Sequence, residues 1–264
     1  MTDNHDRGLQ FDLATLFGRR RALSLLGGAG LTLVACAPST TTTSTGSTTT
    51  SAAAGAALET IPEETAGPYP GDGSNGPNAL TQSGIVRSDI RSSFGSSTRT
   101  AEGVRLTIDL TAQKEDGTPF QGAAIYLWHC DMNGDYSMYS DRVKDENFLR
   151  GVQEADASGK LKFVSVFPGA YSGRWPHIHF EVYPSLAEAT KAGNKVITSQ
   201  LALPETTCKE VYGTTGYTQS VRNMSRTSLQ QDMVFRDGTD EQMASMSGDV
   251  ASGYTASLTF AVQG

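Results

Sequence analysis

The sequence contains little positive charge. Lysine and arginine together number 21, against 28 aspartate and glutamate residues, so the 264-residue chain has a formal net charge of −7. No basic stripe occurs beyond the N-terminal region. Proteins that bind nucleic acid need clustered lysine and arginine to contact the phosphates, and this composition therefore excludes a nucleic-acid partner.

Long apolar runs are also missing. The apolar stretch at residues 22–35, which follows Arg19, Arg20 and Arg21, is too short to span a bilayer and is typical of an export signal. It ends in Leu-Val-Ala before Cys36, which resembles a bacterial lipobox, in which the cysteine is acylated. The consecutive arginines resemble a twin-arginine signal. An ordinary signal peptide that ends before a cysteine is the alternative.

The next segment has almost no side chains that could form a core. Residues 39–51 are nearly all serine and threonine, so residues 36–57 are predicted to be a solvated tether. The chain then divides into an export signal (1–35), the tether and a folded domain (58–264). This organisation predicts an exported, extracytoplasmic protein, either secreted or attached to a membrane only through a lipid on Cys36.

Cysteine is scarce as well, with three residues in the chain. Beyond Cys36 only Cys130 and Cys208 remain. Two cysteines in an exported protein can oxidise, which predicts a Cys130–Cys208 disulfide. Two buried, reduced thiols are the alternative.

Helical periodicity is sparse, and only residues 185–193 and 228–235 could form short helices. Alternation with a period of two dominates instead, as in residues 104–110 and 257–262, and glycine, asparagine, aspartate and proline separate the alternating segments. The pattern predicts an all-β fold, namely an antiparallel β-sandwich with long active-site loops and few short helices.

Histidine is rare, with four residues, yet two of them lie two positions apart. On a strand over residues 177–183, the side chains of His177, His179 and Glu181 share one face, and the apolar residues between them share the other. Such a histidine pair is a common way for a strand to give two ligands to one metal ion. Two hydrogen-bonded structural histidines are the alternative.

Further residues precede this pair in a fixed order. A D-x-x-G-x-Y loop ends at Tyr136, a P-G-x-Y turn ends at Tyr171, and an R-x-x-H-x-H segment runs from Arg174 to His179. This order resembles the intradiol ring-cleavage dioxygenases, the family of catechol and protocatechuate dioxygenases. The resemblance covers roughly residues 58–185.

The resemblance implies a ferric iron cofactor, Fe(III), and a reaction with O2. A catechol-type aromatic diol would be cleaved between its two hydroxyl-bearing carbons to a muconate-type diacid. Carried over to this chain, the iron ligands are Tyr136, Tyr171, His177 and His179. Phenolates suit Fe(III), because a hard cation favours anionic oxygen and can remove the tyrosine proton at neutral pH. The resemblance also makes Tyr171 a base for the substrate.

Other residues receive secondary roles. The resemblance places Arg174 beside the substrate ring, where its charge would stabilise developing negative charge. Tyr69, in a Gly-Pro-Tyr stretch that the family also has, would line the pocket mouth and contact substrate. Tyr126 and Tyr139 are possible rival ligands to Tyr136, but Tyr126 lies inside a predicted strand ahead of the loop and Tyr139 misses the D-x-x-G-x-Y spacing. His129 lies on the opposite strand face from the metal loop and is predicted to make structural hydrogen bonds.

Two other functions stay open. The strand–turn–strand pattern at residues 104–128 also resembles transthyretin-like sandwiches, which would bind a partner without iron. A 2-His-1-carboxylate Fe(II) oxygenase would use Glu181 beside the histidines. The related ring-cleaving enzymes often dimerise through an N-terminal helical region, and none is evident in this sequence, which favours a monomer.

Overall fold

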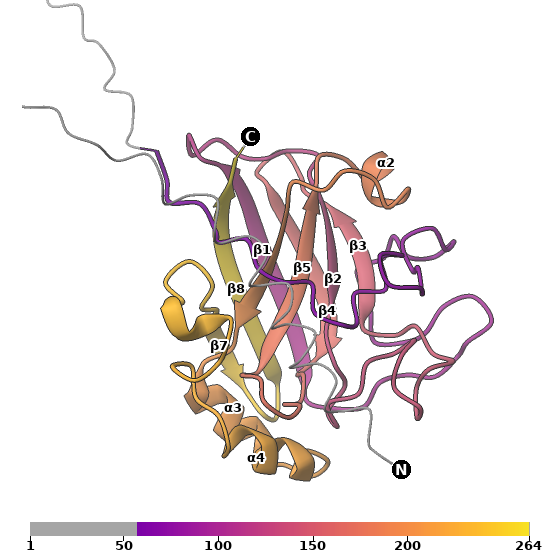
Figure 1. Cartoon of the computed structure of the whole chain (residues 1–264), viewed down its shortest axis with the longest axis vertical. Coiled ribbons are helices and arrows are strands. Elements are labelled where there is room, and N and C mark those ends of the chain that lie inside the picture. Colours follow the sequence, from indigo (N-terminus) through magenta and orange to yellow (C-terminus); the bar gives the residue numbers. More distant parts are fainter. Residues whose placement is uncertain (1–56, 264) are drawn as a thin grey trace, which may run out of the picture.

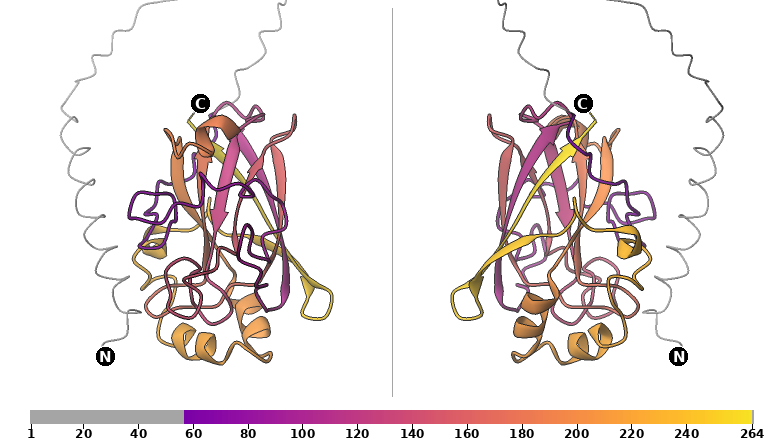
Figure 2. Two further views of the ribbon diagram at one scale, coloured as in Figure 1. Left: turned by 90° about the vertical axis from the view of Figure 1, so that its right-hand side faces the viewer. Right: turned by 90° about the vertical axis from the view of Figure 1, so that its left-hand side faces the viewer.

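A computed structural model describes residues 57–263 of the chain (Figures 1 and 2). Two four-stranded sheets pack face to face as a sandwich with a few short helices, which confirms the predicted fold class. The predicted signal, most of the tether and the predicted acylation site Cys36 lie outside the described residues. Among the described residues, no helix has the length and apolar character needed to cross a bilayer.

The first sheet has the strand order β4–β1–β8–β7. Its strands are β1 (Arg105–Lys114), β4 (Lys160–Val166), β7 (Ser245–Asp249) and β8 (Gly253–Val262). Strand β1 pairs antiparallel with β4 but parallel with β8, so one pair departs from the antiparallel pattern. Along β1 every second residue is buried, as expected for a sheet that packs on the core with one face only.

The second sheet has the order β3–β2–β5–β6, and all of its pairs are antiparallel. Its strands are β2 (Ala124–Trp128), β3 (Arg150–Glu154), β5 (His177–Tyr183) and β6 (Ile197–Ala202). Every residue of β2 and of β5 is buried, which means that both faces of these central strands are covered. The inner face meets the first sheet, and the outer face is covered by loops and by the short helix at residues 186–189.

The two faces of β5 have different surroundings. Ile178, Phe180 and Val182 belong to the large apolar core between the sheets, as the alternation predicts. The outer face of the same sheet lies under a second, more aromatic cluster, which includes Tyr136 and Tyr171. The alternation of β5 therefore sends both of its histidines to this covered outer face rather than into water.

The helices of the described residues are short. They are α2 (Leu186–Ala189), α3 (Glu205–Tyr212), α4 (Thr218–Met224) and the 3-10 helix η2 (Phe235–Asp237). Helices α3 and α4 lie at one end of the strands and α2 lies at the other (Figure 1). The predicted helix over 185–193 is present as α2, whereas α3 and α4 were not predicted.

The predicted helix over 228–235 is wrong, because this segment forms turns that lead into η2. The Asp232 carboxylate explains the difference. Its Oδ1 atom accepts the backbone N–H groups of Val234 and Phe235, at 2.8 Å and 3.2 Å. An aspartate that bonds nearby backbone groups in this way competes with helix formation.

His129 connects the two sheets just beyond β2. Its Nδ1 lies 2.7 Å from the Cys130 carbonyl oxygen and its Nε2 lies 2.7 Å from Ser165 Oγ on β4. Because a carbonyl only accepts, Nδ1 carries the proton and Nε2 accepts from the serine. The predicted structural role is therefore confirmed, and burial lowers the pKa of His129 to about 4.

A depressed histidine pKa makes stability depend on pH. The unfolded chain takes up a proton near pH 6.5, whereas folded His129 stays neutral down to about pH 4, so stability is lost as the pH falls between these values. His129→Gln should remove about 1.5 kcal/mol of the stability difference between pH 6.5 and pH 5. Urea unfolding of chelator-treated protein at both pH values measures it. An unchanged pH dependence in the variant would contradict the assignment.

Candidate metal centre

The four predicted iron ligands share one site. The Nε2 atoms of His177 and His179 are 3.0 Å apart, and Tyr171 Oη lies 3.3 Å from His177 Nε2. The Tyr136 ring lies against them, with its centroid 5.7 Å from that of Tyr171 and 6.2 Å from that of His179. All four side chains are buried. Two imidazoles and two phenols therefore meet on the outer face of the second sheet.

The loop that carries Tyr136 is shaped by the aspartate and the glycine of its motif. Asp131 Oδ1 accepts the backbone N–H groups of Asn133 and Asp135, at 2.8 Å and 3.0 Å, which closes a tight turn. Gly134 has a φ of 89°, in the region that favours glycine, and an added Cβ would lie 3.2 Å from the Tyr171 Cβ. The motif therefore folds this loop closely onto the second tyrosine.

The glycine before Tyr171 has a similar function. A Cβ at Gly169 would lie 2.6 Å from the Met132 carbonyl oxygen and 2.8 Å from that of Asp131. Any larger residue would push the 168–171 turn away from the 131–136 loop. Glycine is thus required on both loops if the two phenols are to lie in one site.

His177 is held in the tautomer that a metal ligand needs. Its Nδ1 bonds the Trp175 carbonyl oxygen, so Nδ1 carries the proton and Nε2 offers its lone pair. Burial, followed by the nearby Arg174 cation, lowers the pKa of His177 to about 3. The imidazole is therefore neutral at physiological pH, which is the form that binds metal ions.

His179 is fixed by stacking. Its ring lies on that of Trp128, with the centroids 4.9 Å apart and the planes 5° from parallel. The two residues face each other across the β2–β5 register. Burial and the neighbouring His177 lower the pKa of His179 well below its ordinary value. The Nδ1 atom of His179 is buried without a hydrogen-bond partner.

The Tyr136 hydroxyl gives the clearest sign that a cation fits this site. Its oxygen is buried and has no hydrogen-bond partner, although an unpaired hydroxyl in a protein interior costs free energy. Burial, with Tyr171 next in importance, raises the pKa of Tyr136 well above its ordinary value. A bound cation reverses both effects, because it favours the phenolate and occupies its lone pair. The donor set therefore fits a hard metal ion such as Fe(III).

Arg174 is buried beside the tyrosines. Its Nη1 lies 3.4 Å from Tyr171 Oη, its Nη2 donates to Gln200 Oε1 at 2.6 Å, and its Nε donates to Asp232 Oδ2 at 2.9 Å. Both members of the pair with Asp232 are almost completely buried. The Arg174 guanidinium thus adjoins the candidate metal centre, held by two side chains that no sequence motif marks.

Three further tyrosines named from the sequence lie near this site, and none of the three joins the candidate ligands. The Tyr69 ring packs on that of Tyr136, with the centroids 4.9 Å apart, so Tyr69 lies against one candidate ligand, and its contact with substrate stays a prediction. The Tyr126 hydroxyl donates to the Pro70 carbonyl oxygen, and the Tyr139 hydroxyl donates to Asn75 Oδ1. Both rival phenols are therefore engaged elsewhere.

Glu181 does not join the histidines. Its carboxylate pairs with Lys195 and accepts a hydrogen bond from the Tyr183 hydroxyl at 2.8 Å. In the part of the chain that the structure describes, no group of three or more histidine, cysteine, aspartate or glutamate side chains is placed to hold a metal ion. These contacts argue against the 2-His-1-carboxylate alternative.

The predicted Cys130–Cys208 disulfide is not formed, and both cysteines are buried and free. Cys130 lies in the aromatic cluster on the outer face of the second sheet, whereas Cys208 lies on α3 in the core between the sheets. Each thiol donates to a different carbonyl oxygen, that of Gly169 or that of Leu203. The alternative of two buried, reduced thiols is the one that the structure supports.

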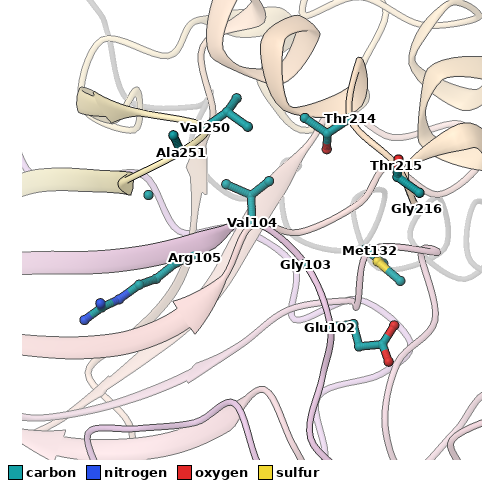
Figure 3. Close-up of a pocket in the computed structure, with 11 residues that line it drawn as sticks. Glu102, Gly103, Val104, Arg105, Met132, Thr214, Thr215, Gly216, Val250 and Ala251 are labelled. Atoms are coloured by element: carbon teal, nitrogen blue, oxygen red, sulfur yellow. The ribbon is translucent and has the colours of Figure 1, made fainter.

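Two cavities lie near the helical end of the sandwich. One, of about 730 Å³, opens between the start of β1, the loop at residues 214–216 and the β7–β8 turn (Figure 3). The other, of about 530 Å³, lies beside Trp175 and between α3 and α4. Neither is lined by any of the four candidate ligands. Trp175 nevertheless brings the second cavity next to the loop that carries Arg174.

Known proteins that are similar to this chain include dioxygenases, as the order of the tyrosine and histidine motifs predicts. A family model described as "Dioxygenase" matches residues 76–198, a range that contains all four candidate ligands and Arg174. A chlorocatechol 1,2-dioxygenase of Rhodococcus opacus is 33% identical over 69 residues, or 26% of this chain and 27% of the relative. A catechol 1,2-dioxygenase of Acinetobacter lwoffii is 41% identical over 58 residues, or 22% of this chain and 21% of the relative. These matches thus span about a quarter of each curated relative.

Solved structures share the fold over a larger part of the chain. An intradiol ring-cleavage dioxygenase from Tetranychus urticae superposes with a TM-score of 0.57 at 24% identity and covers 68% of this chain and 87% of its own. The dioxygenase domain of a carbohydrate-binding fusion from Streptomyces sp. SirexAA-E gives a TM-score of 0.50 at 19% identity, covering 78% and 99%. The family model and these relatives show that the chain is similar to intradiol ring-cleavage dioxygenases in sequence over residues 76–198 and in fold over a larger part of its length.

Proposed function

We propose that this protein is a non-haem Fe(III) dioxygenase that cleaves catechol-type rings between the two hydroxyl-bearing carbons. The observation that carries the proposal is the convergence of Tyr171 Oη with the Nε2 atoms of His177 and His179, beside the unpartnered hydroxyl of Tyr136. A binding module of the transthyretin type has no need for two neutral imidazoles and two phenols in a closed, apolar setting.

The proposed reaction balances without another reactant. The carbon–carbon bond between the two hydroxyl-bearing carbons breaks, and each atom of O2 enters one of the two new carboxyl groups of a muconate-type diacid. The ring is oxidised and O2 is reduced, so no external reductant is required. When bound, Fe(III) would supply Lewis acidity that withdraws electron density from the chelating diol.

The chain would contribute binding, proton transfer and fixed charge. Tyr136, His177 and His179 would hold the metal ion, and Tyr171 would also take a proton from a substrate hydroxyl at its Oη atom. Arg174, whose Nη1 is 3.4 Å from that oxygen, would stabilise negative charge on Tyr171 and on the substrate. The aromatic and apolar side chains around the site would exclude water, which strengthens these electrostatic interactions.

The location of the reaction is a further part of the proposal. The N-terminal pattern supports export and acylation at Cys36, followed by a tether that holds the folded domain away from the membrane surface. The catechol-type substrate would then be met outside the cytoplasm by a monomeric domain. Radiolabelling with palmitate and size-exclusion chromatography test acylation and the monomeric state separately.

A visible spectrum tests the proposed function. The purified, iron-loaded protein should show a broad tyrosinate-to-ferric absorption that shifts when catechol is added without O2. Tyr136→Phe should lose a large part of this absorption and at least about 90% of the turnover, because one phenolate is removed from the metal. Tyr126→Phe is the matched control, since it removes an equally buried phenol that bonds Pro70 instead.

The outcomes separate the candidates. A protein that stays colourless after incubation with ferric iron would contradict the tyrosinate ligands and favour the binding module. If Tyr136→Phe kept the absorption and Tyr126→Phe lost it, the phenolate ligand would be Tyr126 and its assignment to Tyr136 would be wrong.

A further inference from the structure

The segment between α4 and η2 brings a buried carboxylate to the candidate metal centre. Asp232 lies in this segment, more than 50 residues along the chain from the motif, and its carboxylate is completely buried. It pairs with Arg174, whose side chain is 1% exposed. Two charges so deeply buried need excellent geometry and further hydrogen bonds to offset the cost of removing them from water.

The Asp232 carboxylate has those further bonds. Its Oδ2 atom accepts from Arg174 Nε at 2.9 Å and from the Trp175 backbone N–H at 2.6 Å. Its Oδ1 atom accepts the two backbone N–H groups that fix its own loop, those of Val234 and Phe235. One side chain therefore ties the 232–235 turn to both the side chain and the backbone of the Arg174–Trp175 segment.

These contacts determine the direction of the guanidinium. Asp232 occupies the Nε position of Arg174, and Gln200 Oε1 accepts from Nη2 at 2.6 Å. With these two positions bonded, Nη1 is directed at Tyr171 Oη. The Trp175 carbonyl oxygen, in the same peptide segment, fixes the tautomer of His177. Asp232 thus reaches two of the groups that the proposed reaction uses without touching the reacting atoms.

The charges of Arg174 and Asp232 also indicate that Asp232 supports Arg174. Without Asp232, the Arg174 cation would be buried and uncompensated beside a site that is proposed to bind another cation. The Asp232 carboxylate neutralises it and holds it in one place, so that its charge acts on the Tyr171 oxygen.

We propose that Asp232 is a positioning residue that acts through Arg174, orienting the guanidinium toward Tyr171 and compensating its charge. This inference rests on the proposed function. It assigns to the 232–235 turn a role in turnover that is separate from iron binding, because Asp232 forms its hydrogen bonds with Arg174 and with backbone groups rather than with the four candidate ligands.

The test combines single and double variants of purified, iron-loaded protein. Asp232→Asn keeps the shape of the side chain and removes its charge. We expect kcat to fall at least about 10-fold with bound iron retained, since disturbing a group that orients an active-site residue typically costs 10–100-fold. The tyrosinate absorption should shift as Arg174 moves relative to the Tyr171 oxygen. Glu181→Gln is the matched control, because it neutralises another buried carboxylate, one that is paired with Lys195 instead of Arg174.

The double variant identifies the route of the effect. If Asp232 acts through Arg174, then kcat of Arg174→Gln/Asp232→Asn should equal that of Arg174→Gln alone, because the loss is not additive for two residues that act as a unit. A further 10-fold loss in the double variant would overturn the inference. This comparison does not require Asp232→Asn to fold on its own. The amide pair of the double variant leaves no unpaired charge, and in Arg174→Gln the Asp232 carboxylate keeps its three backbone N–H donors.

Failure of the inference can be told apart from failure of the proposed function. If the unaltered protein neither binds iron nor cleaves catechol, the proposed function fails. If the unaltered protein does both and Asp232→Asn matches it in kcat and in absorption, only the role of Asp232 is refuted.

Discussion

Replacement of His179 by alanine is expected to remove iron from the protein. The His179 Nε2 atom lies 3.0 Å from that of His177, and its ring is fixed by stacking on Trp128 of the neighbouring strand β2. Losing even a residue that supports a metal ligand costs 10–100-fold in affinity or activity, so losing a ligand should cost at least about 100-fold. Iron content by mass spectrometry should fall below about one tenth per chain, and ring cleavage should disappear with it.

The chain offers a matched control for this prediction. His129 is an equally buried, neutral histidine one residue beyond the strand that pairs with β5, but its ring bonds Ser165 of the other sheet. His129→Gln should therefore bind iron normally and lose only stability. If His179→Ala kept full iron occupancy while His129→Gln lost it, the iron ligand would be His129 and its assignment to His179 would be wrong.

The histidine face shows which parts of the site are encoded locally. Alternation along a strand is a backbone property, so the positions of His177 and His179 on one face, opposite Ile178 and Phe180, could be predicted from the sequence. The glycine and aspartate spacings of the two tyrosine loops are also local, and the family resemblance supplied their pairing with the strand. Local pattern and resemblance together were therefore sufficient to select all four candidate ligands.

The residues that support the ligands could not be found in this way. Asp232 and Gln200 reach Arg174 from segments 58 and 26 positions away, and no periodicity in the sequence relates them. Trp128 could have been found, because antiparallel pairing of β2 with β5 places it opposite His179. The predicted disulfide failed for a similar reason, since two cysteines cannot be assigned to the same or to different layers from composition alone.

The outer cluster depends on another residue that no motif in the sequence marks. Arg150, at the start of β3, is 1% exposed, and all five of its N–H donors are used. They reach the carbonyl oxygens of Tyr69, Pro70 and Ser137 together with the hydroxyls of Ser137 and Tyr126. One side chain therefore fastens the Tyr69 segment, which covers Tyr136, to the loop that follows Tyr136.

Arg150→Met is expected to cause a large loss of stability. The variant removes the Arg150 donors from three carbonyl oxygens and two hydroxyls, of which Pro70 keeps only the Tyr126 hydroxyl as a donor. A single hydrogen bond to a charged group contributes about 1.5–3 kcal/mol. Because such contributions are not additive, we expect the free energy of unfolding to fall by about 3–5 kcal/mol, the cost typical of breaking a buried charged interaction. Urea unfolding followed by circular dichroism measures this loss.

Two further variants test the explanation in terms of donors rather than charge. Arg150→Lys keeps the charge but has three donors instead of five, so its loss should lie between those of the methionine variant and the unaltered protein. Arg91→Met removes an arginine whose ion pair with Asp89 is about half exposed, and should cost less than about 1 kcal/mol. If the lysine variant were as stable as the unaltered protein, the charge alone would hold the Tyr69 segment. If Arg150→Met lowered the free energy of unfolding by less than Arg91→Met does, the hydrogen bonds of Arg150 would not hold the Tyr69 segment over Tyr136.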